Sequence, residues 1–235
     1  MPFSPTDITG CKLWLKADSL ALNDNDPIST WSDSSGSSND ATASGAVRPT
    51  FKTAQVNGLP AVQFGGSHYL LTPSITTTID SIFIVYKHTS GSGYIIEFEG
   101  NDAANALIAG FTANVETYNS PRISVGAYST SLFNLHEVTR GSGTTTYING
   151  TSVTSDGTNQ HAGGVFTIGA SRLGTADFVT GYIAEIIFYD SVLSTGDRQS
   201  VEGYINTKYF VAAASYARHT YLPPGITQWT VGFER

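Results

Sequence analysis

The sequence predicts an all-β protein, a sandwich or barrel of antiparallel strands, and three observations favour this class. Of 235 residues, 24 are glycine and 13% are charged, which is about half the usual charged share. Short β-branched and aromatic runs recur at intervals of about ten residues. Turn signals such as Asn57-Gly58 and Gly65-Gly66 separate these runs, since asparagine and glycine tolerate the backbone angles of tight turns. This pattern is typical of a sandwich and not of a helical bundle.

The charge balance and the cysteine content exclude several classes of protein. With 12 Lys and Arg against 19 Asp and Glu, the formal net charge is −7, and the basic residues are scattered. This argues against nucleic acid or anionic lipid as a partner. No apolar run approaches the ~20 residues of a membrane span. Cys11 is the one cysteine, which excludes an intrachain disulfide or a cysteine zinc cluster.

The start of the chain, residues 1–5, shows no basic and apolar signal region. We therefore expect a chain made in the cytosol, a chain exported without such a signal, or an excised module.

The expected strands follow from the apolar pattern. Residues 11–17 are apolar at inner and outer positions alike, so we expect a strand buried on both sides. Residues 19–45 are rich in Ser, Asn, Asp and Gly and predict a long loop with one short strand at Trp31. Residues 81–87 form the densest β-branched and aromatic run and predict the best core strand. The other expected strands are 50–52, 61–64, 69–72, 94–99, 107–113, 122–128, 132–139, 144–148, 164–170 and 181–189.

Two local patterns predict a hairpin and a helix. Asn149-Gly150 lies between two β-runs and predicts a two-residue turn, because both central positions need a positive φ. Ser194, followed three residues later by Asp197, is close to a capping box and predicts a helix over about 196–208. The apolar residues on one face of this helix are Val201, Tyr204, Ile205 and Tyr209.

The tail, 211–235, differs from the rest of the chain. Pro223-Pro224 enforces an extended linker, and a last β-like run follows at 226–233. Such a strand either returns to an edge of its own sheet or adds to the edge of a neighbouring subunit. The residues expected to contact a partner in the second case are Tyr221, Ile226, Trp229, Val231 and Phe233.

An ordered set of motifs carries a family resemblance over roughly residues 8–210. They are Leu13-Trp14-Leu15-Lys16-Ala17-Asp18, Trp31-Ser32-Asp33-Ser34-Ser35-Gly36, Arg48-Pro49-Thr50-Phe51, Gly58-Leu59-Pro60-Ala61, Tyr147-Ile148-Asn149-Gly150 and 181–189. The chain resembles the laminin-G-like branch of the concanavalin A-like lectin/glucanase superfamily. This resemblance implies a jelly-roll sandwich of two antiparallel sheets, with one short C-terminal helix. We expect residues 1–210 to form that domain, and 211–235 an extended C-terminal arm with a terminal β-strand.

Glycan binding would need an exposed aromatic face beside polar side chains. Tyr118 and Asn119 lie in a polar stretch, and Tyr128 lies beside a run of Ser and Thr. Trp31 precedes a Ser-Asp-Ser-Ser-Gly loop, and the resemblance favours packing over ligand contact there. These four residues are the expected ligand contacts, and the alternative for each is an ordinary loop or core position.

Asp24 and Asp26 lie in an oxygen-rich loop and are the expected ligands of a calcium ion, since calcium binds six to eight oxygen atoms. The alternative is that Asx turns organise this loop.

Glucanase members of the family carry catalytic carboxylates in a Glu-x-Asp-x-x-Glu pattern. The nearest stretch is Glu97-Phe98-Glu99-Gly100-Asn101-Asp102, which departs from that pattern at its second and third acidic positions. The shorter Asp102 side chain breaks the reach of a carboxyl pair about 5 Å apart. We therefore expect no catalysis and two solvent-facing carboxylates at a strand end.

These observations predict a non-catalytic structural and binding module. The family's distribution favours a bacteriophage virion protein, a capsid decoration or tail component, whose arm contacts other subunits and whose loops bind glycans. A lectin-like domain of a bacterial surface protein or polysaccharide-degrading enzyme, located outside the cell, is one alternative, and a glycoside hydrolase is another.

Overall fold

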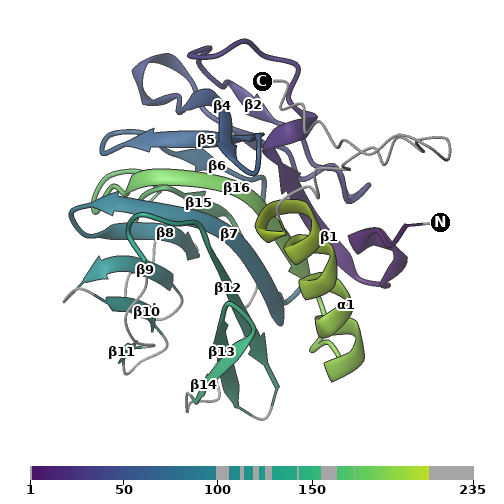
Figure 1. The fold of residues 1–235 in the computed structure, drawn as a ribbon. Helices are drawn as coiled ribbons and strands as arrows, with labels where there is room; N and C mark the ends of the chain where they lie inside the picture. The colour runs from purple at the N-terminus through teal and green to yellow at the C-terminus, as the bar shows by residue number, and fades with distance from the viewer. Residues whose placement is uncertain are drawn as a thin grey trace, which may run out of the picture.

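Two antiparallel sheets face each other, and one helix lies against the outside of the first sheet (Figure 1). The structure is a computed structural model that describes residues 2–98, 106–111, 114–118, 122–124, 129–141, 143–154, 163–171 and 173–211. The predicted all-β jelly roll is confirmed. No helix among these described residues is long and apolar enough to cross a membrane.

The first sheet, sheet A, has the strand order β14-β13-β12-β7-β16-β5-β4, and β1 pairs with β16. Its strands are β1 (Cys11–Lys16), β4 (Thr50–Val56), β5 (Leu59–Gly65), β7 (Ser81–Ser90), β12 (Asn134–Arg140), β13 (Thr144–Ile148), β14 (Thr151–Thr154) and β16 (Thr180–Tyr189). The predicted core strand 81–87 and the expected strand 181–189 are neighbours in the middle of this sheet. Both can be apolar on two faces because each face is covered.

The second sheet, sheet B, has the strand order β11-β10-β9-β8-β15-β6-β3-β2. Its strands are β2 (Thr30–Trp31), β3 (Ala41–Thr42), β6 (Leu70–Leu71), β8 (Gly93–Phe98), β9 (Ala106–Phe111), β10 (Asn114–Tyr118), β11 (Arg122–Ser124) and β15 (Phe166–Ile168). Strands β8 and β15 lie in its middle.

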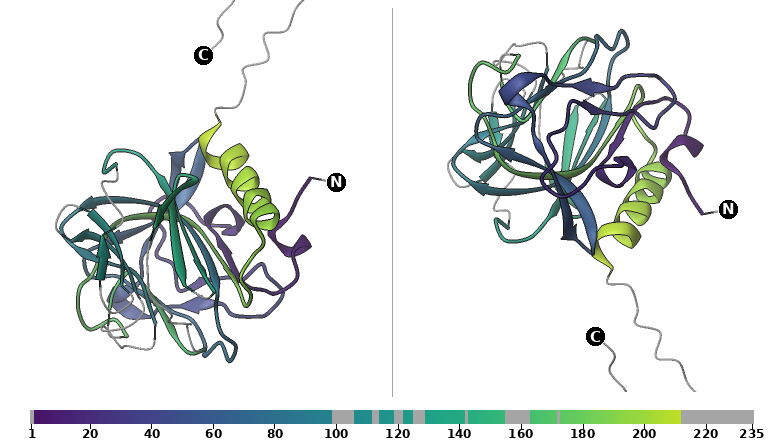
Figure 2. Two further views of the ribbon diagram at one scale, coloured as in Figure 1. Left: turned by 90° about the horizontal axis from the view of Figure 1, so that it is seen from below. Right: turned by 90° about the horizontal axis from the view of Figure 1, so that it is seen from above.

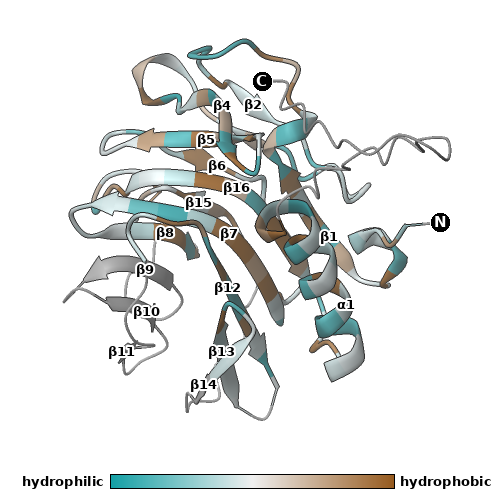
Figure 3. Cartoon of the chain, in the orientation of Figure 1, coloured by the Kyte–Doolittle hydropathy of each residue, from teal (hydrophilic) through white to brown (hydrophobic). Residues whose placement is uncertain are grey.

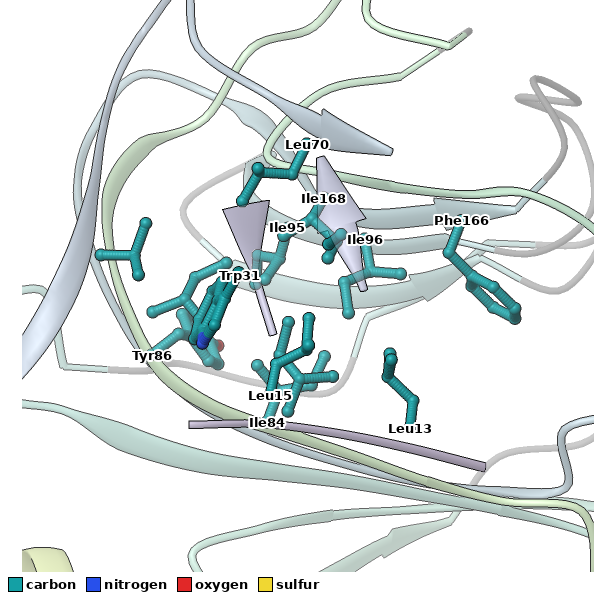
Figure 4. Packing of buried hydrophobic residues seen from close by; sticks show 14 of the residues in the cluster. Leu13, Leu15, Trp31, Leu70, Ile84, Tyr86, Ile95, Ile96, Phe166 and Ile168 are labelled. Carbon is teal, nitrogen blue, oxygen red and sulfur yellow. The ribbon is translucent and has the colours of Figure 1, made fainter. Parts of the chain in front are cut away.

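The core between the sheets is built from residues at alternate positions of both sheets. Figure 4 shows Trp31 of sheet B among Leu15, Ile84 and Tyr86 of sheet A. All four side chains are at most 1% exposed. Burial of this apolar area is the main stabilising contribution to the sandwich.

A second apolar layer lies on the outer face of sheet A. It is covered by α1 (Thr195–Ile205) and by the π-helical turn η4 (Asn206–Phe210). Figure 2 shows α1 along one side of the sandwich, close to the N-terminal segment, where the rings of Phe3 and Tyr204 lie 6.4 Å apart. Figure 3 shows β7 hydrophobic where it passes α1 and hydrophilic toward its other end. Short 3-10 turns are η1 (Pro5–Asp7), η2 (Ala17–Ser19) and η3 (Gly45–Val47).

The predicted hairpin and helix start are both confirmed. Asn149 and Gly150 have φ values of 51° and 76°, as the two-residue turn requires. The Ser194 side chain accepts a hydrogen bond from the Asp197 backbone N–H and caps α1.

A buried carboxylate fixes the helical segment to sheet A. Glu185 of β16 is 1% exposed and accepts four hydrogen bonds. Its Oε1 receives Trp14 Nε1 at 2.5 Å and the Tyr204 hydroxyl at 2.9 Å. Its Oε2 receives Lys208 Nζ at 2.8 Å and the Tyr209 hydroxyl at 2.6 Å. Burial and the Glu185 charge raise the pKa of both tyrosines above the ordinary value.

Candidate functional site

A row of half-buried side chains crosses the outer face of sheet A at the end of η4. Tyr182 of β16 is the cross-strand partner of Gln63 on β5 and of Lys87 on β7. Residues that are directly opposite on neighbouring strands share a face, so these three side chains form one line. Phe133 precedes β12 and lies beside them. We call Gln63, Lys87, Phe133 and Tyr182 the aromatic patch.

The side chains of the aromatic patch contact one another. The Phe133 and Tyr182 rings have centroids 6.4 Å apart and are tilted by 53°. Lys87 Nζ lies 4.9 Å from the Tyr182 ring centroid and 5.4 Å from that of Phe133. Gln63 Nε2 donates to the Tyr182 hydroxyl at 3.1 Å. The ammonium group therefore lies over two partly accessible rings, and the amide binds the hydroxyl group of one of them.

A groove of about 370 Å³ begins at this patch. One wall is the β4–β5 hairpin with Gln55 and Asn57, and the other is formed by residues 131–133. Phe210 of η4, 38% exposed, and Leu132, 65% exposed, lie at its rim. Asn57 fixes the helical wall, because its Nδ2 donates to the Lys208 and Val211 carbonyls. The groove is thus lined by aromatic rings, amides and one ammonium group, a combination suited to a sugar.

A larger groove of about 700 Å³ lies between the N-terminal segment and α1, but its polar groups are already used. The Ser200 and Thr207 hydroxyls donate to helix carbonyls. Lys208 is held by Glu185 and Asp18. A third groove, of about 300 Å³, lies over β3 and β6 beside Tyr69.

The prediction that Trp31 contacts a ligand is wrong. Its side chain is 0% exposed because β2 directs it into the core, where it pairs across the strands with Ala41. The packing alternative holds for this residue.

The other expected glycan contacts can be placed only in part. Tyr118 ends β10 and pairs with Ala106, which in turn pairs with Glu97. These three residues therefore occupy one cross-strand row of sheet B. Asn119 and Tyr128 lie outside the described residues, as do the five residues of the predicted partner contact in the tail.

Asp24 and Asp26 hold the loop and the adjacent strand together. Asp24 accepts a hydrogen bond from the Thr53 backbone N–H at 2.9 Å, which lowers the pKa of its carboxyl, and it pairs with Lys52 at 3.4 Å. Asp26 accepts the Asn23 N–H at 2.7 Å. Within the described ranges, no group of three His, Cys, Asp or Glu residues could hold a metal ion. Calcium binding at this loop stays a prediction.

The expectation that Glu97 faces solvent is wrong. Its side chain is 0% exposed, because both faces of β8 are covered and every residue of that strand is buried. Glu99 lies outside the described residues.

The aromatic patch was not predicted from the sequence. Residues 181–189 carry large side chains at almost every position, which hides the outward position of Tyr182. Phe133 was assigned to the expected strand 132–139 without a role in a binding site. Lys87 could have indicated an accessible position, because it is a charged residue at the end of an otherwise apolar strand.

Comparison with known proteins identifies the family. The model of the concanavalin A-like lectin/glucanases superfamily matches residues 71–197, more than half of the chain. No curated protein sequence matches the chain.

Solved structures share the fold. Domain 4 of AbnA, a GH43 extracellular arabinanase of Geobacillus stearothermophilus solved with arabinotriose, has a TM-score of 0.59 and 16% identity, covering 82% of this chain and 97% of that domain. Trypanosoma rangeli sialidase in complex with sialic acid has a TM-score of 0.61 and 13% identity over 86% of this chain. The binding domain of botulinum neurotoxin serotype D has a TM-score of 0.60 and 15% identity over 83% of this chain.

The extent of these matches differs. The present chain spans 33% of the sialidase and 51% of the neurotoxin chain, but nearly all of the arabinanase domain. At such identities the likeness concerns the fold alone. Together with the family match, the sandwich shows that this chain belongs to the concanavalin A-like lectin/glucanase superfamily, in its laminin-G-like branch.

Proposed function

We propose that this chain is a non-catalytic glycan-binding module that binds an oligosaccharide across the aromatic patch and the adjoining groove. The observation that carries the proposal is the cross-strand row Gln63–Tyr182–Lys87 with Phe133 at its end. The aromatic rings would stack on the apolar face of a sugar, and the amide and ammonium groups would bind its hydroxyls.

Two further observations support this assignment. Rigid strands hold three of the four patch residues, which limits the entropy lost on binding. The family match and the resemblance to an arabinanase domain solved with arabinotriose also fit a sugar ligand.

The burial of Glu97 supports the non-catalytic part of the proposal. A carboxylate must reach the scissile bond to act as acid or nucleophile, and the Glu97 side chain is 0% exposed. Hydrolysis of β-glucans or arabinans that Glu97→Gln abolishes, without a loss of folding, would contradict it.

The test is a glycan array followed by calorimetric titration of the glycans that bind. Tyr182→Leu and Phe133→Leu keep apolar volume but remove the ring face, so each should weaken binding about tenfold or more. The matched control is Tyr147→Leu. Tyr147 is also half-buried on the outer face of sheet A, and the Arg198 guanidinium carbon lies 4.0 Å from its ring centroid. Equal losses in all three variants would contradict the assignment, as would an array without binding.

A role in a phage virion is the second proposal, and its support is the sequence of the tail. The run of Tyr, Trp, Ile and Phe residues after Pro223-Pro224 suits addition to a neighbouring subunit. If this is right, the purified chain forms assemblies that deletion of residues 218–235 disperses. A monomer with or without that segment would contradict it.

A further inference from the structure

We infer that the ligand of the aromatic patch carries a carboxylate, as in a uronic or sialic acid, and that Lys87 binds it. This inference rests on the proposed function, because it names the class of sugar for the same site. It starts from the arrangement of charge around the groove.

Three of the other four lysines have an ammonium group that contacts a carboxylate, and the fourth, Lys16, lies over the Trp14 ring at 4.1 Å, away from the groove lining. Lys12 pairs with Asp190 at 3.0 Å, and Lys52 pairs with Asp24 at 3.4 Å. Lys208 pairs with both Asp18 and Glu185. In the described part of the chain, Lys87 has no such carboxylate and lies over two aromatic rings.

The lining of the groove carries a positive charge and no carboxylate. Its lining consists of Gln55, Val56, Asn57, Lys87, Ser131, Leu132, Phe133, Tyr209 and Phe210. Lys87 is the one charged residue in that lining, although the chain as a whole has a net charge of −7. An anionic ligand therefore meets a positive charge inside the groove and no described carboxylate beside it.

The two rings make Lys87 a positioned binding group. A ring face attracts an ammonium group, and contact with two rings restricts the freedom of a long side chain. The ammonium group lies beside both rings, so a sugar stacked on Tyr182 or Phe133 would bring a ring carboxylate toward Nζ. A charge-assisted hydrogen bond at that point is stronger than one between neutral groups.

Gln63 completes the arrangement on the other side of Tyr182. Its Nε2 donates to the Tyr182 hydroxyl, so its carbonyl oxygen faces away from that bond and can accept from a sugar hydroxyl. A sugar lying along the row then meets an amide at one edge and an ammonium group at the other. This arrangement suits a sugar ring that carries hydroxyl groups on one side and a carboxylate on the other.

The test compares acidic glycans with the same glycans after their charge is removed. The probes are oligogalacturonate, oligomannuronate and sialyllactose, each with its methyl ester, titrated by calorimetry at low and high salt. We expect at least one acidic probe to bind about tenfold or more tightly than its ester. That difference should shrink as the salt concentration rises.

Two variants assign the difference to Lys87. Lys87→Met should abolish the preference for the acid, so that acid and ester bind with affinities within about twofold of each other. Lys12→Met removes the same charge from a half-exposed lysine elsewhere and should leave the preference intact. If Lys12→Met lowers the preference as much as Lys87→Met does, the effect is one of net charge and the inference is overturned.

The remaining outcomes separate this inference from the proposed function. Neutral glycans that bind through Tyr182 and Phe133 as tightly as acidic ones would overturn the carboxylate and leave the glycan site standing. A folded protein that binds no glycan, acidic or neutral, would overturn both.

Discussion

Replacing Glu185 by glutamine tests whether the buried carboxylate holds α1 and η4 on sheet A. The carboxylate accepts four hydrogen bonds, two at each oxygen. Glutamine keeps the shape but offers one acceptor oxygen, and its amide N–H groups then face two donors. Whichever way the amide turns, either Trp14 Nε1 or the Lys208 ammonium group meets a donor.

The expected loss follows from these contacts. Two charge-assisted hydrogen bonds disappear at about 1.5–3 kcal/mol each, and the partly buried Lys208 loses one of its two carboxylate partners, so Glu185→Gln should lower the free energy of unfolding by about 3–5 kcal/mol. Asp18→Asn is the matched control, because Asp18 binds the same Lys208 at 2.9 Å but its side chain is 30% exposed. It should cost less than about 1 kcal/mol.

Urea unfolding, followed by far-ultraviolet circular dichroism and by tryptophan fluorescence, measures both variants. The reasoning is refuted if Glu185→Gln loses less than about 1 kcal/mol, or if Asp18→Asn loses as much as Glu185→Gln.

Three further predictions concern pH, the hairpin and the core. Burial raises the pKa of Glu137 from 4.5 to about 7, so its contribution to stability is full below pH 4.5 and is lost by pH 7. Burial lowers the pKa of His136 from 6.5 to about 3, so its contribution is full above pH 6.5 and falls with acid. Between pH 4.5 and 6.5 the two residues change the free energy of unfolding in opposite directions, so their effects cancel. In the Glu137→Gln variant only the His136 effect remains, and the free energy of unfolding, measured with urea, should fall as the pH is lowered. An unchanged dependence on pH would contradict this cancellation. Gly150→Ala should cost about 1–2 kcal/mol from its φ of 76° alone, since nothing lies near the new Cβ, whereas Gly203→Ala, also in open space but within α1, should gain about 0.5–1 kcal/mol. Trp31→Ala should cost about 3–5 kcal/mol, and a loss below 1 kcal/mol in the same assay would contradict its place in the core.

The elements that depend on local sequence were predictable. The turn at Asn149-Gly150 follows from backbone preferences of two residues, and the helix start at Ser194 follows from one side chain and one N–H. Strand β7 was predicted because β-branched and aromatic residues dominate it. These signals act over a few residues and do not need the rest of the fold.

The positions that depend on strand pairing were not predictable. Glu97 looks exposed from its place after an apolar run, yet both faces of β8 are covered and the side chain is buried. The hydrogen bond that Asp24 accepts comes from Thr53, 29 residues away, and the sequence pattern did not predict that contact. The register of distant strands decides both cases, and the sequence pattern does not contain it.

The aromatic patch shows the same dependence, through one irregularity in β16. Its register against β7 shifts between Ile183 and Glu185, which identifies a β-bulge at Ala184. Without the bulge, strict alternation would place Tyr182 and Ile186 on one face, and Ile186 lies in the core between the sheets. With it, Tyr182 and Glu185 both reach the outer face.

One strand therefore supplies the ring of the candidate binding site and the anchor of the helical segment that borders the groove. Because Glu185 holds Tyr209, and Tyr209 and Phe210 line the groove, the groove depends on the anchor as well as on the patch. The outer face of sheet A is thus divided by the bulge into a part covered by α1 and a part that stays accessible to a ligand.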